Sequence, residues 1–190
     1  MGSTVAVSRA DAVARPRRLR RLWAMLLLVT APVLALDQLS KLYIATHFHL
    51  YQAVVLVSNW LDITYTLNPG AAFSLFATMP EGFRGVFFLT LSAIAIVVLV
   101  ALMARRSPGP LMNSIAFALI LGGTIGNLID RIARGKVIDF IYFHHDSFRY
   151  PVFNVADSAI TIGVAIIVIF NVFAGHSEAG RDAPSRPEQV

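Results

Sequence analysis

The sequence predicts an α-helical integral membrane protein with four transmembrane helices and a small β-sheet cradle on the outer membrane surface. Three observations lead to this prediction: the composition, four long apolar runs, and one segment in which apolar and polar residues alternate. The chain is 56% hydrophobic and 14% charged, with a mean hydropathy of +0.66, whereas an ordinary soluble domain has roughly 25% charged residues. A length of 190 residues suits one compact membrane domain.

Four apolar runs account for the predicted helices. The last three each approach the roughly 20 residues that a helix needs to cross the hydrocarbon core of a bilayer. The first reaches that length only if it continues through Asp37 towards Ile44. In chain order, the runs cover residues 22–36, 85–104, 111–129 and 158–175.

The first run has a second interpretation as a cleavable signal peptide. Basic residues precede it and small residues occur near Ala35, which is the pattern of such peptides. Cleavage there would leave three membrane helices. The following segment, DQLSKLYIA, continues with helical character and does not open into a polar mature start, so we favour a membrane helix.

The distribution of basic residues predicts the orientation, because Lys and Arg are enriched in cytoplasmic loops and tails. Arginines precede the first run, lie between the second and third runs, and follow the fourth. With four crossings these three regions share one side, so both termini are predicted to be cytoplasmic. The bias is strongest in the N-terminal tail, since the opposite side also holds Arg131, Arg134, Lys136 and Arg149.

Two polar tails, residues 1–20 and 176–190, are predicted to be disordered and cytoplasmic, and they flank one membrane domain, residues 21–175. The net charge of +5 would also suit a nucleic-acid-binding protein. However, the sequence has no basic patch with interleaved aromatic residues of the kind that stacks bases. We therefore expect no nucleic-acid partner.

The segment between the first two runs, about residues 48–82, predicts β-structure on the outer side. Residues 61–68 alternate apolar and polar side chains with β-branched and aromatic types, which is typical of a half-buried strand. Residues 54–58 would supply a partner strand, and the Asn-Pro-Gly sequence at 68–70 is a turn signal. A small sheet at the membrane surface is the simplest interpretation.

Four aspartates lie at the predicted outer ends of the helices. A charge at the centre of a bilayer costs between about 3 and more than 10 kcal/mol, so acidic residues near membrane helices are functional candidates. Separate segments here bring carboxylates to one level of the membrane, which predicts a functional site there. The four residues are Asp37, Asp130, Asp139 and Asp157.

Three of these aspartates also have structural interpretations. Asp37 and Lys41 have the spacing of an ion pair on one helix face. Asn127 and Asp130 share a helix face and would tie the third helix to the sheet, while Arg131 suits the negative end of the helix dipole. Asn154 and Asp157 are spaced as the N-cap and N3 residues of the fourth helix. For Asp157, capping and catalysis remain open at this point.

Asp139 has no helix start to cap and is flanked by apolar residues in KVIDFIYF. A buried carboxylate there needs a partner or becomes neutral. If it lies beside Asp157, repulsion would make the two carboxylates share one proton. Such a coupled pair can take a proton from water and protonate a carbonyl or a leaving amine.

Other chemistries fit the sequence less well. The chain has no cysteine, which excludes disulfides and thiolate catalysis. His47, His49, His144 and His145 lack the spacing of a helical zinc motif, so no metal is expected. No serine lies in a nucleophile elbow, and the glycines of LGGTIGN indicate close helix packing. A proton-coupled carrier and a membrane scaffold remain as alternatives, although the acids lie at one surface and no repeat is present.

Five motifs occur in order along the chain: DQLSK, NPGAAFS, GGTIGNLIDR, GKVIDF and FNVADSAI. As a set, from Asp37 to about Gly163, they resemble the bacterial lipoprotein signal peptidases, also called signal peptidase II. The resemblance implies an aspartic endopeptidase of the bacterial inner (cytoplasmic) membrane, with four membrane helices and a periplasmic β-sheet cradle. Its active site would lie at the periplasmic face.

The resemblance also implies the substrate and the residue roles. The substrates would be prolipoproteins whose cysteine carries a diacylglyceryl group, cut on the N-terminal side of that cysteine without a cofactor. The enzyme would act as a monomer among membrane lipids, with Asp139 and Asp157 as its catalytic dyad. Asp37 and Lys41 would be a structural ion pair. The supporting positions would be Asn68, Gly70, Asn127, Asp130, Arg131, Asn154 and Ala156.

Overall fold

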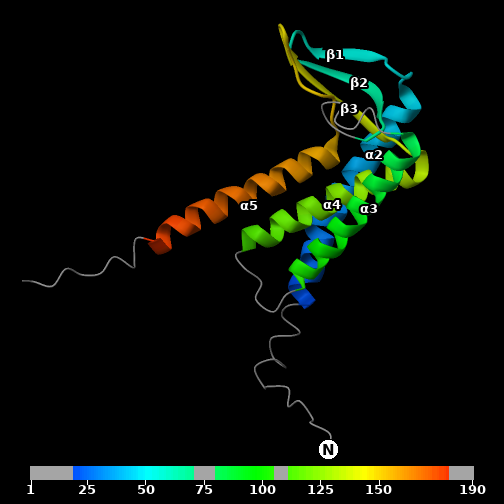
Figure 1. Cartoon of the computed structure of the whole chain (residues 1–190). Coiled ribbons are helices and arrows are strands. Elements are labelled where there is room, and N and C mark those ends of the chain that lie inside the picture. Colours follow the sequence, from blue (N-terminus) through cyan, green and yellow to red (C-terminus); the bar gives the residue numbers. More distant parts are fainter. Residues whose placement is uncertain (1–18, 71–79, 105–110, 180–190) are drawn as a thin grey trace, which may run out of the picture.

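The structure is a computed structural model, and it describes residues 19–70, 80–104 and 111–179. Within these residues, long helices lie side by side at one end and diverge at the other, and a small antiparallel sheet packs at the end where they meet (Figure 1). The predicted tails lie almost wholly outside the described residues. Of the tails, only residues 19–20 and 176–179 are described, and both segments continue a helix.

The first helix runs without a break from Leu19 to His47. It contains a wide, π-helical stretch, η1 (Leu26–Thr30), followed by α2 (Ala31–His47), and Ala31 N–H bonds to Leu26 O. Pro32 explains the wide turn, because its ring has no N–H and crowds the preceding turn. The helix passes through Ala35 unchanged, as the membrane-helix interpretation requires.

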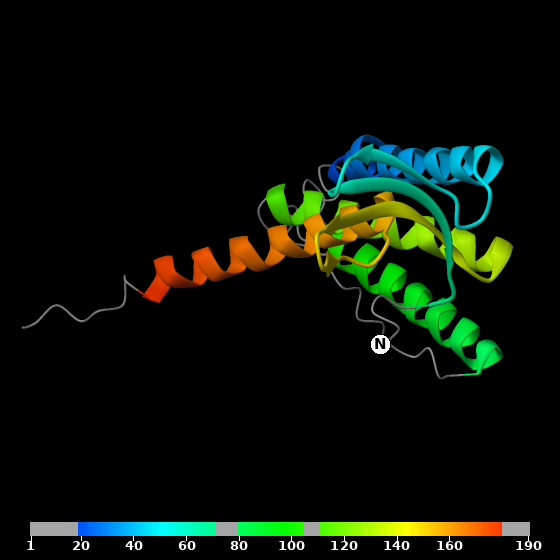
Figure 2. The same cartoon turned by 90° about the horizontal axis from the view of Figure 1, so that it is seen from above.

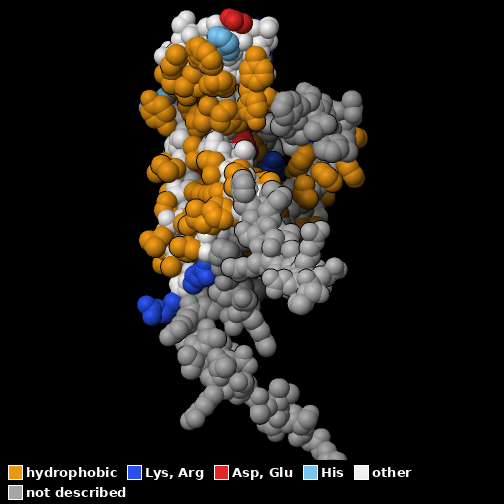
Figure 3. Space-filling view, turned by 90° about the vertical axis from the view of Figure 1, so that its left-hand side faces the viewer, with side chains coloured by type: hydrophobic (Ala, Val, Ile, Leu, Met, Phe, Trp, Pro, Cys, Tyr) orange, Lys and Arg blue, Asp and Glu red, His pale blue; other side chains and the backbone are white. Residues whose placement is uncertain are grey.

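The other long helices are α3 (Glu81–Met103), α4 (Leu111–Arg134) and α5 (Val155–Ala179). In the described part of the chain, three helices are long and apolar enough to cross a membrane: Leu19–His47, Gly82–Met103 and Leu111–Arg134. Val155–Phe170 is a shorter apolar stretch. Hydrophobic side chains cover much of the surface in Figure 3, and many large ones on the helices are exposed. The chain is a multi-pass membrane protein.

Glycines on α4 let the helices approach closely, as the sequence predicted. A Cβ built on Gly122 would lie 3.0 Å from Val33 of α2, and one on Gly123 would lie 2.8 Å from Ile160 of α5. A Cβ on Gly126 would meet the Asp37 carboxylate. At the level of the acidic residues, the backbone of α4 therefore packs directly against residues of α2 and α5.

The sheet has the strand order β1-β2-β3-β4, with every neighbouring pair antiparallel. Its strands are β1 (Ala53–Val57), β2 (Leu61–Asn68), β3 (Val137–His145) and β4 (Phe148–Arg149). The predicted strand at 61–68 and its partner are confirmed. The two strands after α4 were not predicted, because the first four residues of β3 are buried on both faces and so show no alternation.

The sheet joins the helices through a small hydrophobic core. Ile44 near the end of α2 packs with Ile138 and Phe140 of β3, and Val155 at the start of α5 packs against them. In the chain, β3 follows α4 and comes before α5, and in Figure 2, seen from above, the sheet lies over the helices. This core fixes the position of β3 relative to α2 and the start of α5.

Candidate active site

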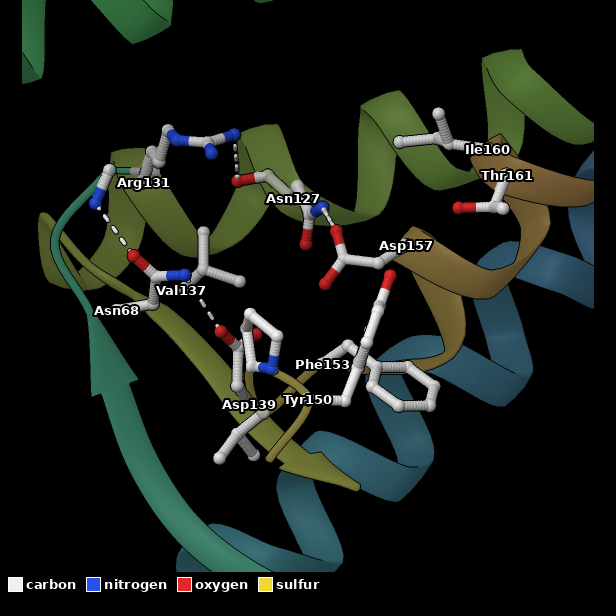
Figure 4. A pocket seen from close by; sticks show the side chains of 13 residues that line it. Asn68, Asn127, Arg131, Val137, Asp139, Tyr150, Phe153, Asp157, Ile160 and Thr161 are labelled. Atoms are coloured by element: carbon white, nitrogen blue, oxygen red, sulfur yellow. Dashed lines mark hydrogen bonds between the residues drawn. The ribbon is translucent and has the colours of Figure 1, made fainter. Parts of the chain in front are cut away.

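Asp139 and Asp157 line one cavity of about 250 Å³. Asp139 is the third residue of β3, and Asp157 lies in the first turn of α5. Figure 4 shows the two side chains on different walls of this cavity, Asp139 from the strand and Asp157 from the helix. The cavity lies where the membrane helices meet the sheet.

Two amide groups donate hydrogen bonds to the Asp139 carboxylate. Asn68 Nδ2 donates to Oδ2 at 2.9 Å, and Asn154 Nδ2 donates to Oδ1 at 2.7 Å. The side chain is 2% exposed. Burial raises the pKa of Asp139 to about 7, and the charge of Asp157 acts in the same direction, while the two amide donors oppose it. Near neutral pH this carboxyl is therefore poised between its two protonation states.

Asp157 is both a capping residue and a wall of the cavity. Its backbone N–H donates to Asn154 Oδ1 at 2.9 Å, and Asn154 N–H donates to Asp157 Oδ2 at 3.3 Å, which is the reciprocal pattern of a capping box. Its other oxygen, Oδ1, accepts from Asn127 Nδ2 at 2.7 Å. The two interpretations left open by the sequence are therefore compatible.

A buried ionic cluster lies behind the cavity. Lys41 Nζ is 2.9 Å from Asp37 Oδ2 and 3.0 Å from Asp130 Oδ2, and all three side chains are at most 1% exposed. Arg134 is 2.8 Å from the other oxygen of Asp130. Lys41 also donates to Asn127 Oδ1 at 2.9 Å, which connects this cluster to the amide that bonds Asp157.

The cluster also holds backbone segments in place. Ala156 N–H donates to Asp37 Oδ1 at 2.9 Å, and Ile138 N–H donates to Asp130 Oδ2 at 3.2 Å. These two bonds attach the residues just before Asp157 and Asp139 to the same buried charges. Ala156 is fully buried and faces Gly123 and Gly126 of α4.

Two more of the predicted residues lie on the cavity wall. Arg131 carries its guanidinium 5.3 Å from the centre of the Phe88 ring, a favourable arrangement of a cation over an aromatic face. A Cβ on Gly70 would lie 2.5 Å from Phe88 and 3.0 Å from Arg84. Only a glycine fits at residue 70 without moving these side chains.

The structure thus separates the predicted residues into two groups. The cavity is lined by Asn68, Gly70, Asn127, Arg131, Asp139 and Asp157. The remaining predicted residues lie behind it and hold the first group in place: Asp37, Lys41, Asp130, Asn154 and Ala156.

The segment between β4 and α5 also contributes to the site, although the sequence did not indicate it. Tyr150, Pro151, Val152 and Phe153 all line the cavity, and of these residues only Phe153 belongs to one of the five motifs, as the first residue of FNVADSAI. Tyr150, Phe153 and Asp157 also line a second, more apolar cavity of about 350 Å³. The only sequence signal was an apolar and aromatic run directly before the N-cap residue.

The histidines considered as metal ligands have other partners. His144 Nε2 lies 3.1 Å from Asp62 Oδ2, and His145 stacks on Trp60 with ring centres 4.0 Å apart. Both residues are in β3 towards the far turn of the sheet. No group of three or more metal-binding side chains occurs in residues 19–70, 80–104 and 111–179.

Apolar helices, a surface sheet and a cavity with two amide-bonded carboxylates define a membrane protein with a paired-carboxylate site. The comparison with known families agrees with this class. The family model described as signal peptidase (SPase) II matches residues 29–173. The chain belongs to the signal peptidase II family, and it is therefore a protease.

Relatives named lipoprotein signal peptidase are similar over most of their length. The protein of Syntrophus aciditrophicus is 42% identical over 146 residues, which cover 76% of this chain and 91% of that protein. The protein of Yersinia enterocolitica is 42% identical over 160 residues, which cover 84% and 90%.

Two solved structures share the fold, each described as a bacterial membrane enzyme structure by the in meso method. The one at 2.3 Å resolution has a TM-score of 0.70 and 29% identity, over 86% of this chain and 93% of the other. The one at 1.9 Å resolution has a TM-score of 0.67 and 32% identity, over 75% and 89%.

Proposed function

We propose that this protein removes signal peptides from prolipoproteins with Asp139 and Asp157 as its catalytic dyad. The observation that carries the proposal is that both carboxylates line one cavity while each accepts hydrogen bonds from neutral amides. No cation within salt-bridge distance of either carboxylate was found among the described side chains. The pair therefore keeps its capacity to exchange protons.

The dyad would act by general acid–base catalysis. One carboxylate takes a proton from water as the water oxygen attacks the scissile carbonyl carbon, and the other protonates the carbonyl oxygen. The tetrahedral intermediate then collapses with cleavage of the C–N bond. The leaving amine takes the proton that came from water, and one hydroxyl of the intermediate returns its proton to the second carboxylate. The pKa of about 7 for Asp139 supports one shared proton near neutral pH.

The substrate bond would lie next to a lipid-modified cysteine. A diacylglyceryl anchor holds such a bond at the membrane surface, and cleavage on its N-terminal side frees the signal peptide. The cavity lies where the helices meet the sheet, so it would meet the bond at that level. Apolar walls such as Val137, Val152 and Phe153 would strengthen the electrostatic effect of the dyad.

The membrane arrangement is part of the proposal. Four crossings, with α5 as the fourth, place both termini in the cytoplasm and the sheet at the periplasmic face of the inner membrane. Lys and Arg side chains at the end of the molecule away from the sheet support this orientation (Figure 3). Since the chain has no cysteine, single cysteines introduced at Ser3 and Asn59 would test it with a membrane-impermeant thiol reagent. Only the cysteine at Asn59 should react in intact spheroplasts.

We further propose that a monomer suffices, because both carboxylates and all their hydrogen-bond donors belong to one chain. The activity per molecule should then stay constant when the enzyme is diluted in detergent micelles. A loss of specific activity on dilution would contradict this part of the proposal.

The deciding experiment uses purified protein and a synthetic precursor peptide that carries a diacylglyceryl cysteine. The wild type should release the signal peptide with the lipid-modified cysteine as the new N-terminus, and Asp139→Asn should not. The same peptide without the lipid tests the substrate requirement. Equal cleavage of both peptides would exclude the lipid-dependent substrate, and retained cleavage by Asp139→Asn would exclude the dyad.

A further inference from the structure

The ammonium group of Lys41 makes three contacts, and one of them is not needed for charge balance. Lys41 lies 2.9 Å from Asp37 Oδ2 and 3.0 Å from Asp130 Oδ2, and Arg134 also contacts Asp130. Two cations thus face two carboxylates. The third N–H of Lys41 donates to a neutral acceptor, Asn127 Oδ1, at 2.9 Å.

This third contact determines which way the Asn127 amide faces. A carboxamide accepts at its oxygen and donates at its nitrogen, whereas an ammonium group only donates. Lys41 therefore holds Oδ1 towards itself and leaves Nδ2 directed at Asp157 Oδ1, 2.7 Å away. If the Asn127 amide were reversed, its NH₂ group would face the Lys41 ammonium group and its oxygen would face the Asp157 carboxylate. Both hydrogen bonds would then be lost.

A second amide beside the dyad, that of Asn154, is oriented by a backbone donor. Asn154 Oδ1 accepts from the backbone N–H of Asp157 at 2.9 Å, so its Nδ2 is directed at Asp139 and at Asn127 Oδ1. Within the described part of the chain, the partners found for Asn127 Oδ1 are Lys41 and Asn154. Of these two, only Lys41 carries a charge, and its bond is shorter, at 2.9 Å against 3.2 Å.

We propose that Lys41 is a positioning residue of the catalytic pair, which acts by holding the Asn127 amide so that it donates to Asp157. The inference rests on the proposed dyad and gives Lys41 a role beyond the structural ion pair expected from the sequence. A donor fixed on Asp157 Oδ1 leaves the free lone pairs of the dyad directed at water and substrate. The rate of proton transfer then depends on a side chain that does not line the cavity.

The charged groups around this contact come from several elements. Asp37 is on the same helix as Lys41, and Asp130, Arg131 and Arg134 are on α4. Asp139 lies on β3 and Asp157 on α5. Burial has the largest effect on the pKa of Asp139 and raises it, while the Lys41 charge lowers it. Loss of Lys41 should therefore move the pH–rate profile of the pair to higher pH.

The test compares Lys41→Met with Arg134→Met. Each variant removes one cation from Asp130, but Arg134 has no contact with the Asn127 side chain. For Lys41→Met we expect kcat to fall about tenfold or more with KM within about twofold. Its pH–rate profile should shift upwards by about half a unit or more. Arg134→Met should lower thermal stability and keep the wild-type profile.

A structural role alone would give a different result. Lys41→Met would then lose stability, and the folded fraction would keep the wild-type kcat and pH profile, which would overturn the inference. Failure of Asp139→Asn to lose activity would overturn the dyad itself, so the two failures are distinguishable.

A second variant covers the case in which Lys41→Met does not fold. The double variant Asp37→Asn/Lys41→Met removes one charge of each sign, so no buried carboxylate loses its only cation. It should fold and show the same fall in kcat, with a smaller shift in the pH–rate profile because the net charge beside the dyad is unchanged. Adding Asn127→Ala to it should cost no further activity, because Lys41 acts through Asn127. If Asn127→Ala lowered the activity of the double variant by the same factor as it lowers that of the wild type, the inference would be contradicted.

Discussion

Two neighbouring groups of aspartates in this protein differ in what surrounds them. Asp37 and Asp130 contact the cations of Lys41 and Arg134, whereas Asp139 and Asp157 accept hydrogen bonds from amides. A buried carboxylate beside a cation is held in its charged form. A buried carboxylate beside amides remains able to take up and release a proton, so the first pair suits structure and the second suits catalysis.

The largest expected effect comes from changing the dyad. Asp139→Asn or Asp157→Asn should lower cleavage of a lipid-modified precursor roughly 10⁴-fold or more, because an amide cannot exchange protons and the two residues act as a unit. Asp146→Asn is the matched control, since Asp146 lies in the exposed turn between β3 and β4 and should leave cleavage unchanged. If all three variants cleaved the precursor equally well, Asp139 and Asp157 would not be the catalytic pair.

The second effect concerns the charged cluster. Asp130→Asn should lower the free energy of unfolding by roughly 3–5 kcal/mol, because it removes one of the two carboxylates that neutralise buried Lys41 and also the partner of Arg134. The two tryptophans allow thermal unfolding in detergent to be followed by fluorescence. A loss of stability below about 1 kcal/mol would mean that the charged cluster around Asp130 does little to stabilise the fold.

The third effect is a gain in stability from the loss of a catalytic group. The folded-state pKa of Asp139 is raised to about 7, against about 3.9 in an unfolded chain. Folded protein therefore binds this proton more tightly, and wild-type stability should fall as pH rises from about 4 to about 7. Asp139→Asn removes this dependence, so its stability relative to wild type should increase over that window by roughly 1–4 kcal/mol. A pH-independent difference would contradict the raised pKa.

The smallest effect concerns the turn that connects the two groups. Gly135 has φ +70° and its N–H bonds to Arg131 O at 3.0 Å, which ends α4 and directs the chain from Asp130 into β3. Gly135→Ala should cost about 1 kcal/mol of stability, because Ala disfavours this conformation. Gly82→Ala is the control, since a Cβ there has open space and should change stability by less than about 0.5 kcal/mol.

Several features followed from local sequence because they depend on short spacings. Apolar runs of helical length predicted the membrane helices, and alternation over residues 61–68 predicted β2. The four-residue spacing of Asp37 and Lys41 and the three-residue spacing of Asn154 and Asp157 matched contacts that the structure contains. Each of these relations lies within one or two turns of chain, where backbone geometry sets the distance.

The tertiary structure decided the relations between distant segments. β3 pairs with β2 so that Asp139 lies opposite Thr66, and its buried residues show no alternation that could have revealed a strand. Lys41 reaches Asn127 across 86 positions of sequence, which no spacing rule predicts. The sequence alone thus determined the long helices, strands β1 and β2, and the positions of the acids along the chain. Packing of α2, α4, α5 and β3 decided which carboxylates meet cations and which meet amides, because burial and partners come from neighbours in space.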